Sequence, residues 1–291
     1  MIEGLKQRVA TALVLISALA AFTIFLPPFL YAIFIGLIVM AASWEWSGLV
    51  EGANTKGRVI YLATVLLMLL GAFGVLQVNP VSQQPDVLRA TMILMLGLLW
   101  WTLSFLLVKG YPGTSGLWND NSRIAVMGLL ALLPTWVGII LLKYLDPGGM
   151  LVLGLVIMVA AVDVGAYFAG NQFGKRKLAP LLSPNKSWEG VWGGLITCLL
   201  IGFLFAWLLN RFLTPLAGWQ FAVLLVLPFP VAAFAVLGDL VESMLKRNSQ
   251  VKDSGQLLPG HGGLLDRVDG LLAATPLFVL TLLLVLFELG E

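Results

Sequence analysis

A polar segment between residues 239 and 269 mixes carboxylates with basic side chains. Asp239, Asp266 and Asp269 carry hard oxygen ligands, and Mg²⁺ in proteins usually combines one or two such carboxylates with substrate phosphates. Basic side chains neutralise phosphate oxygens, arginine in bidentate fashion, and the segment contains Lys246, Arg247, Lys252 and Arg267. This combination predicts phosphoryl or nucleotidyl transfer assisted by a divalent metal.

The same segment has the backbone freedom that close approach of a ligand requires, because glycines recur in it at positions 255, 260, 262 and 263. Asp239, Glu242 and Ser243 are spaced by three and four residues, so we expect them on one helical face. The alternative interpretation is a surface loop whose charges only pair with one another, but it leaves Asp239 beside Ser243 unexplained. For His261, the single histidine, a structural hydrogen bond and a substrate contact both stay open.

A further carboxylate, Asp163, lies within an apolar stretch upstream. Tyr167 and Gly170 follow at i+4 and i+7 and therefore share its helical face. An ionised carboxylate inside a bilayer is costly and normally faces a polar cavity or a partner. The segment from Gly170 to Lys175 resembles a phosphate loop only superficially, since three residues instead of four separate its glycines and no Ser or Thr follows the lysine.

Two weaker patterns allow more than one explanation. The pairs Gly170/Gly174 and Gly190/Gly194 are spaced for close helix packing or for a dimer face. The segment Trp44-Glu45-Trp46 is interpreted as an interfacial aromatic anchor with a snorkelling carboxylate, in preference to a catalytic role.

The elements that must position these residues are membrane-spanning helices. The chain has 291 residues, of which 59% are hydrophobic and only 11% are charged, whereas soluble domains carry about 25% charged residues. A helix needs about 20 apolar residues to cross a bilayer. The sequence therefore predicts an all-α, polytopic integral membrane protein with about nine spans, at 9–26, 29–49, 59–78, 90–108, 124–144, 149–170, 189–209, 219–240 and 270–288.

The distribution of basic residues supports this count. With a cytoplasmic N-terminus, only Arg89, Lys143 and Arg211 of the 17 Lys and Arg residues fall on the outer side. The other 14 fall on the cytoplasmic side, as the positive-inside rule requires. The first apolar stretch also resembles a cleavable signal peptide, but it continues without a polar break to Leu26, which favours an uncleaved anchor. The single cysteine, Cys198, excludes an intrachain disulfide and a cysteine metal site.

The polar chemistry divides the chain into two parts. Residues 1–145 are expected to form the N-terminal transmembrane helices, spans 1 to 5. Residues 146–291 are expected to form the catalytic transmembrane part, with cytoplasmic loops at 171–188 and 241–269.

One long motif gives the chain a recognisable likeness. It contains Ser243-x-Leu245-Lys246-Arg247, Lys252-Asp253, Gly255, Leu258-Pro259, His261-Gly262-Gly263-Leu264 and Asp266-Arg267-Val268-Asp269. This pattern resembles the signature of the bacterial phosphatidate cytidylyltransferase (CDP-diacylglycerol synthase) family, with every specified position filled. The likeness extends upstream through Asp163, Gly174-Lys175 and Ser183-Pro184-x-Lys186-Ser187-x-Glu189-Gly190 to the N-terminal Leu5-Lys6-x-Arg8.

The resemblance implies a transfer of the cytidylyl group from CTP to phosphatidic acid, which yields CDP-diacylglycerol and pyrophosphate for phospholipid synthesis. It also implies Mg²⁺, a second cation such as K⁺, and a homodimer. The enzyme would be a multi-pass protein of the bacterial cytoplasmic (inner) membrane with its active site facing the cytoplasm. No nucleic acid is expected as a partner.

Within this resemblance, Asp239 and Asp266 are expected to hold the metal, supported by Ser243 and Asp269. The remaining catalytic residues would be Lys246, Arg247, Lys252, Asp253, His261 and Arg267. Substrate binding would fall to Asp163, Lys175, Lys186, Ser187, Gly262 and Gly263.

Two other classes of membrane protein share features with this sequence. A transporter would share an intramembrane carboxylate and broken helices, but it should also show a repeat between its halves, whereas here the polar chemistry lies in the second half. The CDP-alcohol phosphotransferases act on the same metabolite, but their Asp-Gly-x-x-Ala-Arg motif is absent from this sequence.

Overall fold

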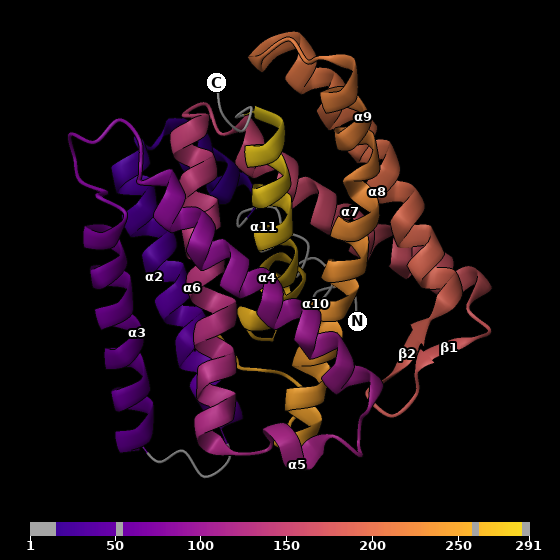
Figure 1. Cartoon of the computed structure of the whole chain (residues 1–291). Helices are drawn as coiled ribbons and strands as arrows, with labels where there is room; N and C mark the ends of the chain where they lie inside the picture. Colours follow the sequence, from indigo (N-terminus) through magenta and orange to yellow (C-terminus); the bar gives the residue numbers. More distant parts are fainter. Residues whose placement is uncertain (1–15, 51–54, 258–261, 287–291) are drawn as a thin grey trace.

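The computed structural model describes residues 16–50, 55–257 and 262–286, which form a bundle of long helices with one small β-hairpin (Figure 1). A short apolar helix, Ile16–Phe25, precedes the labelled elements. These are α2 (Pro28–Leu49), α3 (Thr55–Val75), α4 (Val87–Lys109), α5 (Ser115–Trp118), α6 (Asn121–Leu145), α7 (Met150–Phe173), β1 (Lys177–Ala179), β2 (Ser183–Ser187), α8 (Trp188–Leu208), η1 (Leu209–Leu213), α9 (Gly218–Val226), α10 (Pro228–Asn248) and α11 (Leu265–Leu286).

The predicted all-α, polytopic fold class is confirmed. Within the described residues, eight helical segments are long and apolar enough to cross a membrane. They correspond to predicted spans 2 to 9, with α9 and α10 together forming span 8. The helix Ile16–Phe25 covers the second half of predicted span 1, and the first half of that span lies outside the described residues.

The two predicted cytoplasmic loops are shorter than expected. Helix α10 continues to Asn248 and α11 already begins at Leu265, so residues 241–248 and 265–269 are helical. The prediction ended span 8 where polar residues begin, but those side chains pair inside the protein and the helix continues. Likewise, α7 extends to Phe173 and much of the loop 171–188 forms the antiparallel pair β1–β2.

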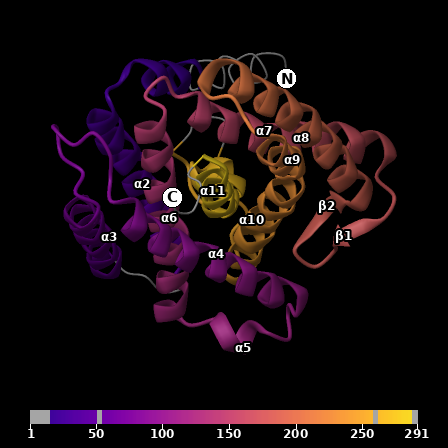
Figure 2. The same cartoon turned by 45° about the horizontal axis from the view of Figure 1, so that its top comes forward.

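Helix α11 occupies the middle of the bundle and is surrounded by its neighbours (Figure 2). It packs against α10, α6 and α4, so the predicted N-terminal and C-terminal parts are in direct contact. Gly238 of α10 lies against the backbone carbonyl of Asp269 on α11, where a side chain would not fit. This close approach places Asp239 and Asp269 on adjoining helices at the same depth of the bundle.

Small residues bring α7 and α8 equally close. A Cβ at Gly194 of α8 would lie 2.6 Å from the carbonyl oxygen of Val162 on α7. Gly170 and Gly190 also face one another, since a Cβ built on either would approach the Cα of the other. Gly170, Gly190 and Gly194 therefore serve close packing of α7 against α8, which confirms the first of the two explanations that the sequence allowed.

Several elements meet at the C-terminal end of α10, and we call this the site end of the molecule. Ser249 Oγ donates to the carbonyl of Leu49 at the end of α2, at 2.5 Å. Arg247 Nε donates to the carbonyl of Leu182 in the β1–β2 turn, at 3.1 Å. Asn248 is hydrogen-bonded to Asn119 after α5, at 2.8 Å. Chain segments far apart in sequence thus converge on one end of α10.

Candidate active site

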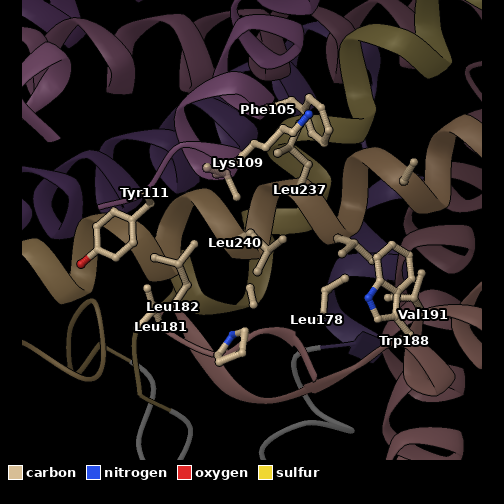
Figure 3. Close-up of a pocket in the computed structure, with 15 residues that line it drawn as sticks. Phe105, Lys109, Tyr111, Leu178, Leu181, Leu182, Trp188, Val191, Leu237 and Leu240 are labelled. Atoms are coloured by element: carbon tan, nitrogen blue, oxygen red, sulfur yellow. The ribbon is translucent and has the colours of Figure 1, made fainter. Parts of the chain in front are cut away.

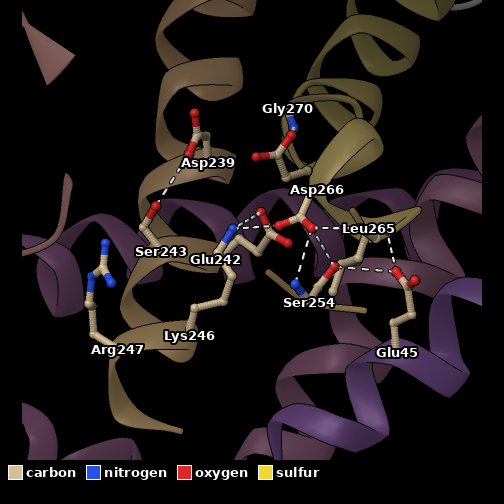
Figure 4. A network of polar contacts seen from close by, with 12 residues as sticks. Glu45, Asp239, Glu242, Ser243, Lys246, Arg247, Ser254, Leu265, Asp266 and Gly270 are labelled. Carbon is tan, nitrogen blue, oxygen red and sulfur yellow. Dashed lines mark hydrogen bonds and ion pairs between the residues drawn. The ribbon is translucent and has the colours of Figure 1, made fainter. Parts of the chain in front are cut away.

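The first polar cluster of the site joins the hairpin to α10. The ammonium group of Lys186 on β2 forms an ion pair with Asp239 of α10. Asp239 also accepts a hydrogen bond from Ser243 Oγ, one turn further along the helix, at 3.3 Å (Figure 4). Asp163 and Asp269 interact electrostatically with Asp239 and with Lys186. Three carboxylates from α7, α10 and α11 therefore converge around one lysine.

These residues border a polar cavity of about 640 Å³, within the range of about 300–1,000 Å³ typical of ligand sites. Asp163 and Tyr167 line it from α7, Lys186 and Ser187 from the hairpin, and Asp239 from α10. The prediction that Asp163 and its helical neighbours face a polar cavity is confirmed. Ser187 has a structural role as well, because its Oγ accepts from the N–H of Gly190 and caps α8.

The second polar cluster lies between α10 and α11. Lys246 Nζ binds Glu242 Oε2 at 3.1 Å and Asp266 Oδ1 at 2.6 Å. The other Asp266 oxygen accepts from the N–H and the hydroxyl of Ser254, at 3.1 and 3.0 Å, and from the N–H of Gly263, at 2.9 Å (Figure 4). Asp266 thus connects the partly buried Lys246 to both arms of the loop between the two helices.

Other residues of the motif lie around these clusters. Gly262 has a φ of 81°, in the left-handed region that favours glycine. The side chains of Lys252 and Asp253 are exposed and form no ion pair with another described residue, and Lys175 is exposed as well. Arg267 is exposed and interacts electrostatically with Asp163. His261 lies outside the described residues.

One residue of the site was missed. The snorkelling role predicted for Glu45 is wrong, because its side chain is 3% exposed and accepts hydrogen bonds from Ser254 and Leu265. Ser254 belongs to the connection between α10 and α11, which we call the motif loop, and Leu265 lies at its end, as the first residue of α11. Trp46 is buried too and donates Nε1–H to the carbonyl of Ile124. Only Trp44 is exposed. A carboxylate between two tryptophans near a helix end is equally typical of an interfacial anchor, so the sequence contained no signal that separated the two roles.

An apolar cavity of about 500 Å³ lies beside the polar one. Its walls come from the end of α4, the hairpin, α8 and α10 (Figure 3), and include Phe105, Leu181, Trp188, Leu237 and Leu240. Lys109 is among the lining residues. Val191 and Val236 line both cavities. These two side chains therefore form part of the wall between the polar cavity and the apolar cavity.

The carboxylates of Asp163 and Asp239 line the polar cavity. Carboxylate oxygens are hard donors, which suit a hard cation such as Mg²⁺. Among the described residues, no three Asp, Glu, His or Cys side chains are placed to hold a metal by themselves. A cation bound here would therefore complete its coordination with oxygens of a phosphate ligand, as Mg²⁺ commonly does.

The fold and the paired cavities define a polytopic membrane protein with a charged pocket beside an apolar one. Comparison with protein families matches residues 6–285 to the cytidylyltransferase family, so the chain belongs to that family. It is 42% identical to the phosphatidate cytidylyltransferase of Pseudomonas aeruginosa over 94% of this chain and 95% of that protein. It is 40% identical to the Haemophilus influenzae phosphatidate cytidylyltransferase over 94% and 97%. The Bacillus subtilis phosphatidate cytidylyltransferase is 45% identical over a shorter region, 45% of this chain and 46% of that protein.

Proposed function

We propose that this protein transfers the cytidylyl group of CTP to phosphatidic acid, which yields CDP-diacylglycerol and pyrophosphate. The observation that carries this proposal, given the family, is the charged cavity that shares Val191 and Val236 with an apolar one. The phosphate of phosphatidic acid would lie in the first cavity and an acyl chain in the second. CTP would enter from the site end, where the motif loop lies.

In this reaction a phosphate oxygen of the lipid forms a bond to the α-phosphorus of CTP. The bond from that phosphorus to the bridging oxygen of the β-phosphate breaks, and its electron pair leaves with pyrophosphate. The lipid phosphate is already an anion near neutral pH, so it needs no general base. The barrier lies in aligning two anions and in stabilising the departing charge, which positioning and fixed cations supply.

The basic residues of the site are assigned to the phosphates. Lys186, from the hairpin, faces the polar cavity and would bind the lipid phosphate or CTP. Lys246 lies between α10 and α11 and would bind the phosphates of CTP. Further screening is assigned to Arg247, Lys252, Arg267 and Lys175, with Gly262 and Gly263 allowing the backbone to approach. Asp253 and His261 are retained as candidates in the same loop.

Mg²⁺ is proposed as the cofactor, with Asp239 and Asp266 as its protein ligands and with support from Ser243 and Asp269. When bound, it would neutralise phosphate charge and orient the α-phosphate. Each of the two carboxylates is paired with a lysine, Lys186 with Asp239 and Lys246 with Asp266. Both lysines are thus placed to contact phosphates that share the metal. A second cation such as K⁺ is proposed alongside.

The site is proposed to face the cytoplasm of a bacterial inner membrane, in a homodimer without a nucleic-acid partner. Supporting this orientation, the basic residues of the hairpin and of the motif loop lie at the site end. Among the described residues, the basic residues assigned to the outer side lie at helix ends away from the site end: Arg89 near the start of α4, Lys143 in the last turn of α6 and Arg211 in η1. This segregation follows the positive-inside rule.

The decisive experiment is pyrophosphate release from CTP by the purified protein in detergent, with and without phosphatidic acid and Mg²⁺. We expect release only when both are present. Asp266→Asn should nearly abolish it while leaving the thermal unfolding transition in place, whereas retained turnover would contradict the metal-ligand assignment. Absence of lipid-dependent release from the wild-type protein would favour a transporter.

A further inference from the structure

Helix α2 holds the motif loop through one buried carboxylate. Glu45 lies in the last turns of α2, far in sequence from the loop, and is 3% exposed. Its Oε2 accepts a hydrogen bond from the N–H of Leu265 at 2.8 Å and from the hydroxyl of Ser254 at 3.3 Å. Both arms of the loop are thus bound to the same oxygen atom, as Figure 4 shows.

The contact with Leu265 lies at the start of α11. The first N–H groups of a helix have no partner within the helix, and a carboxylate placed there is favourable. Glu45 therefore caps α11 from another helix. Asp266, the next residue, binds Lys246, so the orientation of this first turn decides where Asp266 lies.

The hydroxyl of Ser254 connects Glu45 with the site. It lies 3.3 Å from Glu45 Oε2 and 3.0 Å from Asp266 Oδ2. A hydroxyl has one proton to donate, so Ser254 lies between two carboxylates that compete for the same proton. The Ser254 hydroxyl therefore links the Glu45 carboxylate to the Asp266 carboxylate through a single shared group.

Two glycines of the motif lie against the same carboxylate. A Cβ at Gly255 would lie 2.6 Å from Cδ of Glu45, and a Cβ at Gly263 would lie 2.7 Å from its Oε2. Both positions therefore require glycine for a packing reason, because the loop backbone lies directly on the Glu45 side chain. The other Glu45 oxygen is buried without a hydrogen-bond partner among the described residues, an arrangement that costs free energy.

From these contacts we propose that Glu45 is a positioning residue of the active site, which holds Ser254 and the first turn of α11 in place and thereby sets the placement of Asp266 and Lys246. This inference rests on the proposed function for its kinetic test but not for its structural one. Glu45 touches no space assigned to substrate. It acts through Ser254 and the first turn of α11.

The test compares Glu45→Ala, Glu45→Gln and a matched control, Asp146→Ala. Asp146 is also a buried carboxylate that caps a helix, accepting from the N–H of Leu151 at 3.1 Å at the start of α7. It lies at the end of α6, at the opposite end of that helix from the site. Loss of either carboxylate removes a buried helix cap, but only Glu45 contacts the motif loop.

We expect Glu45→Ala to lower kcat for pyrophosphate release about 10- to 100-fold, the range seen when outer residues that orient metal ligands are removed. The KM for phosphatidic acid should change less than about threefold, since the proposed lipid cavities remain. Glu45→Gln keeps an acceptor for the Leu265 N–H and should retain most of the turnover. Asp146→Ala should retain turnover per folded molecule.

Hydrogen exchange provides a readout that is independent of activity. Peptides covering residues 254–266 should exchange faster in Glu45→Ala and unchanged in Asp146→Ala. Unchanged exchange, or unchanged kcat in Glu45→Ala, would overturn the proposal. A Glu45→Gln variant as inactive as Glu45→Ala would also overturn it, because it would indicate a direct role of the charge. If the wild-type protein released no pyrophosphate while the exchange difference persisted, the proposed function would fail and the positioning of the loop would stand.

Discussion

At the scale of single residues, two carboxylates of the site are each paired with a different lysine. Asp239 binds Lys186 and Asp266 binds Lys246, and each pair joins two different elements. Removing one partner of such a pair leaves a charge without compensation in a partly enclosed space, which is more damaging than loss of an exposed pair. The two lysines are therefore expected to matter for folding of the site and for phosphate binding.

Lys186→Ala is expected to reduce pyrophosphate release about 100-fold, the scale on which loss of one fixed group that stabilises transition-state charge acts. The reason is that Lys186 faces the polar cavity from β2. Lys56→Ala removes an exposed lysine at the start of α3 and should leave the rate unchanged. Steady-state assays at saturating CTP check both variants. Equal rates for wild type and Lys186→Ala would rule out its assigned contact with phosphate.

At the scale of elements, close packing of α7 with α8 sets the distance between Asp163 and the hairpin. Gly194→Leu would place a side chain where only 2.6 Å separates a Cβ from the Val162 carbonyl. Overpacking of this kind costs about 1–3 kcal/mol. We expect a lower thermal unfolding temperature in detergent together with reduced turnover. A Cβ at Gly71 of α3 would meet no atom within 4 Å, so Gly71→Leu should change neither, and a similar loss there would contradict the packing argument.

The apolar cavity leads to a prediction about lipid selectivity. Ala233 of α10 lines this cavity, and Ala233→Phe would fill part of it. Each buried CH₂ contributes about 0.8 kcal/mol, so exclusion of two such groups should raise the KM for long-chain phosphatidic acid roughly tenfold. The KM for a short-chain analogue and for CTP should stay near the wild-type values. Ala63→Phe, on the exposed face of α3, is the control, and an equal effect of both variants would locate the acyl chain elsewhere.

At the scale of the whole molecule, the antiparallel helices collect the charged elements at one end. Sidedness can be tested in a Cys198→Ala background, which removes the single cysteine. In intact cells, a membrane-impermeant thiol reagent should label Pro147→Cys, in the exposed α6–α7 connection. It should label Leu257→Cys, in the exposed motif loop, only after permeabilisation. The reverse pattern would place the site outside the cytoplasm.

Much of the architecture follows from the sequence by itself. Apolar stretches of about 20 residues must become helices, because a bilayer offers no partner for unpaired backbone groups. Their number and positions therefore matched the structure from Pro28 onward. Residue types and spacing also identified the motif, and the spacing of Asp239 and Ser243 placed both on one face of α10, where they are hydrogen-bonded.

Only the tertiary structure decided how these residues are paired. The ends of α10 and α11 could not be located, because polar side chains continue a helix when other elements of the protein satisfy them, as Lys246 satisfies Glu242 and Asp266. The role of Glu45 was equally hidden. It depends on contacts across more than 200 residues of sequence, and such contacts follow from the packing of α2 beside the motif loop and not from any local pattern.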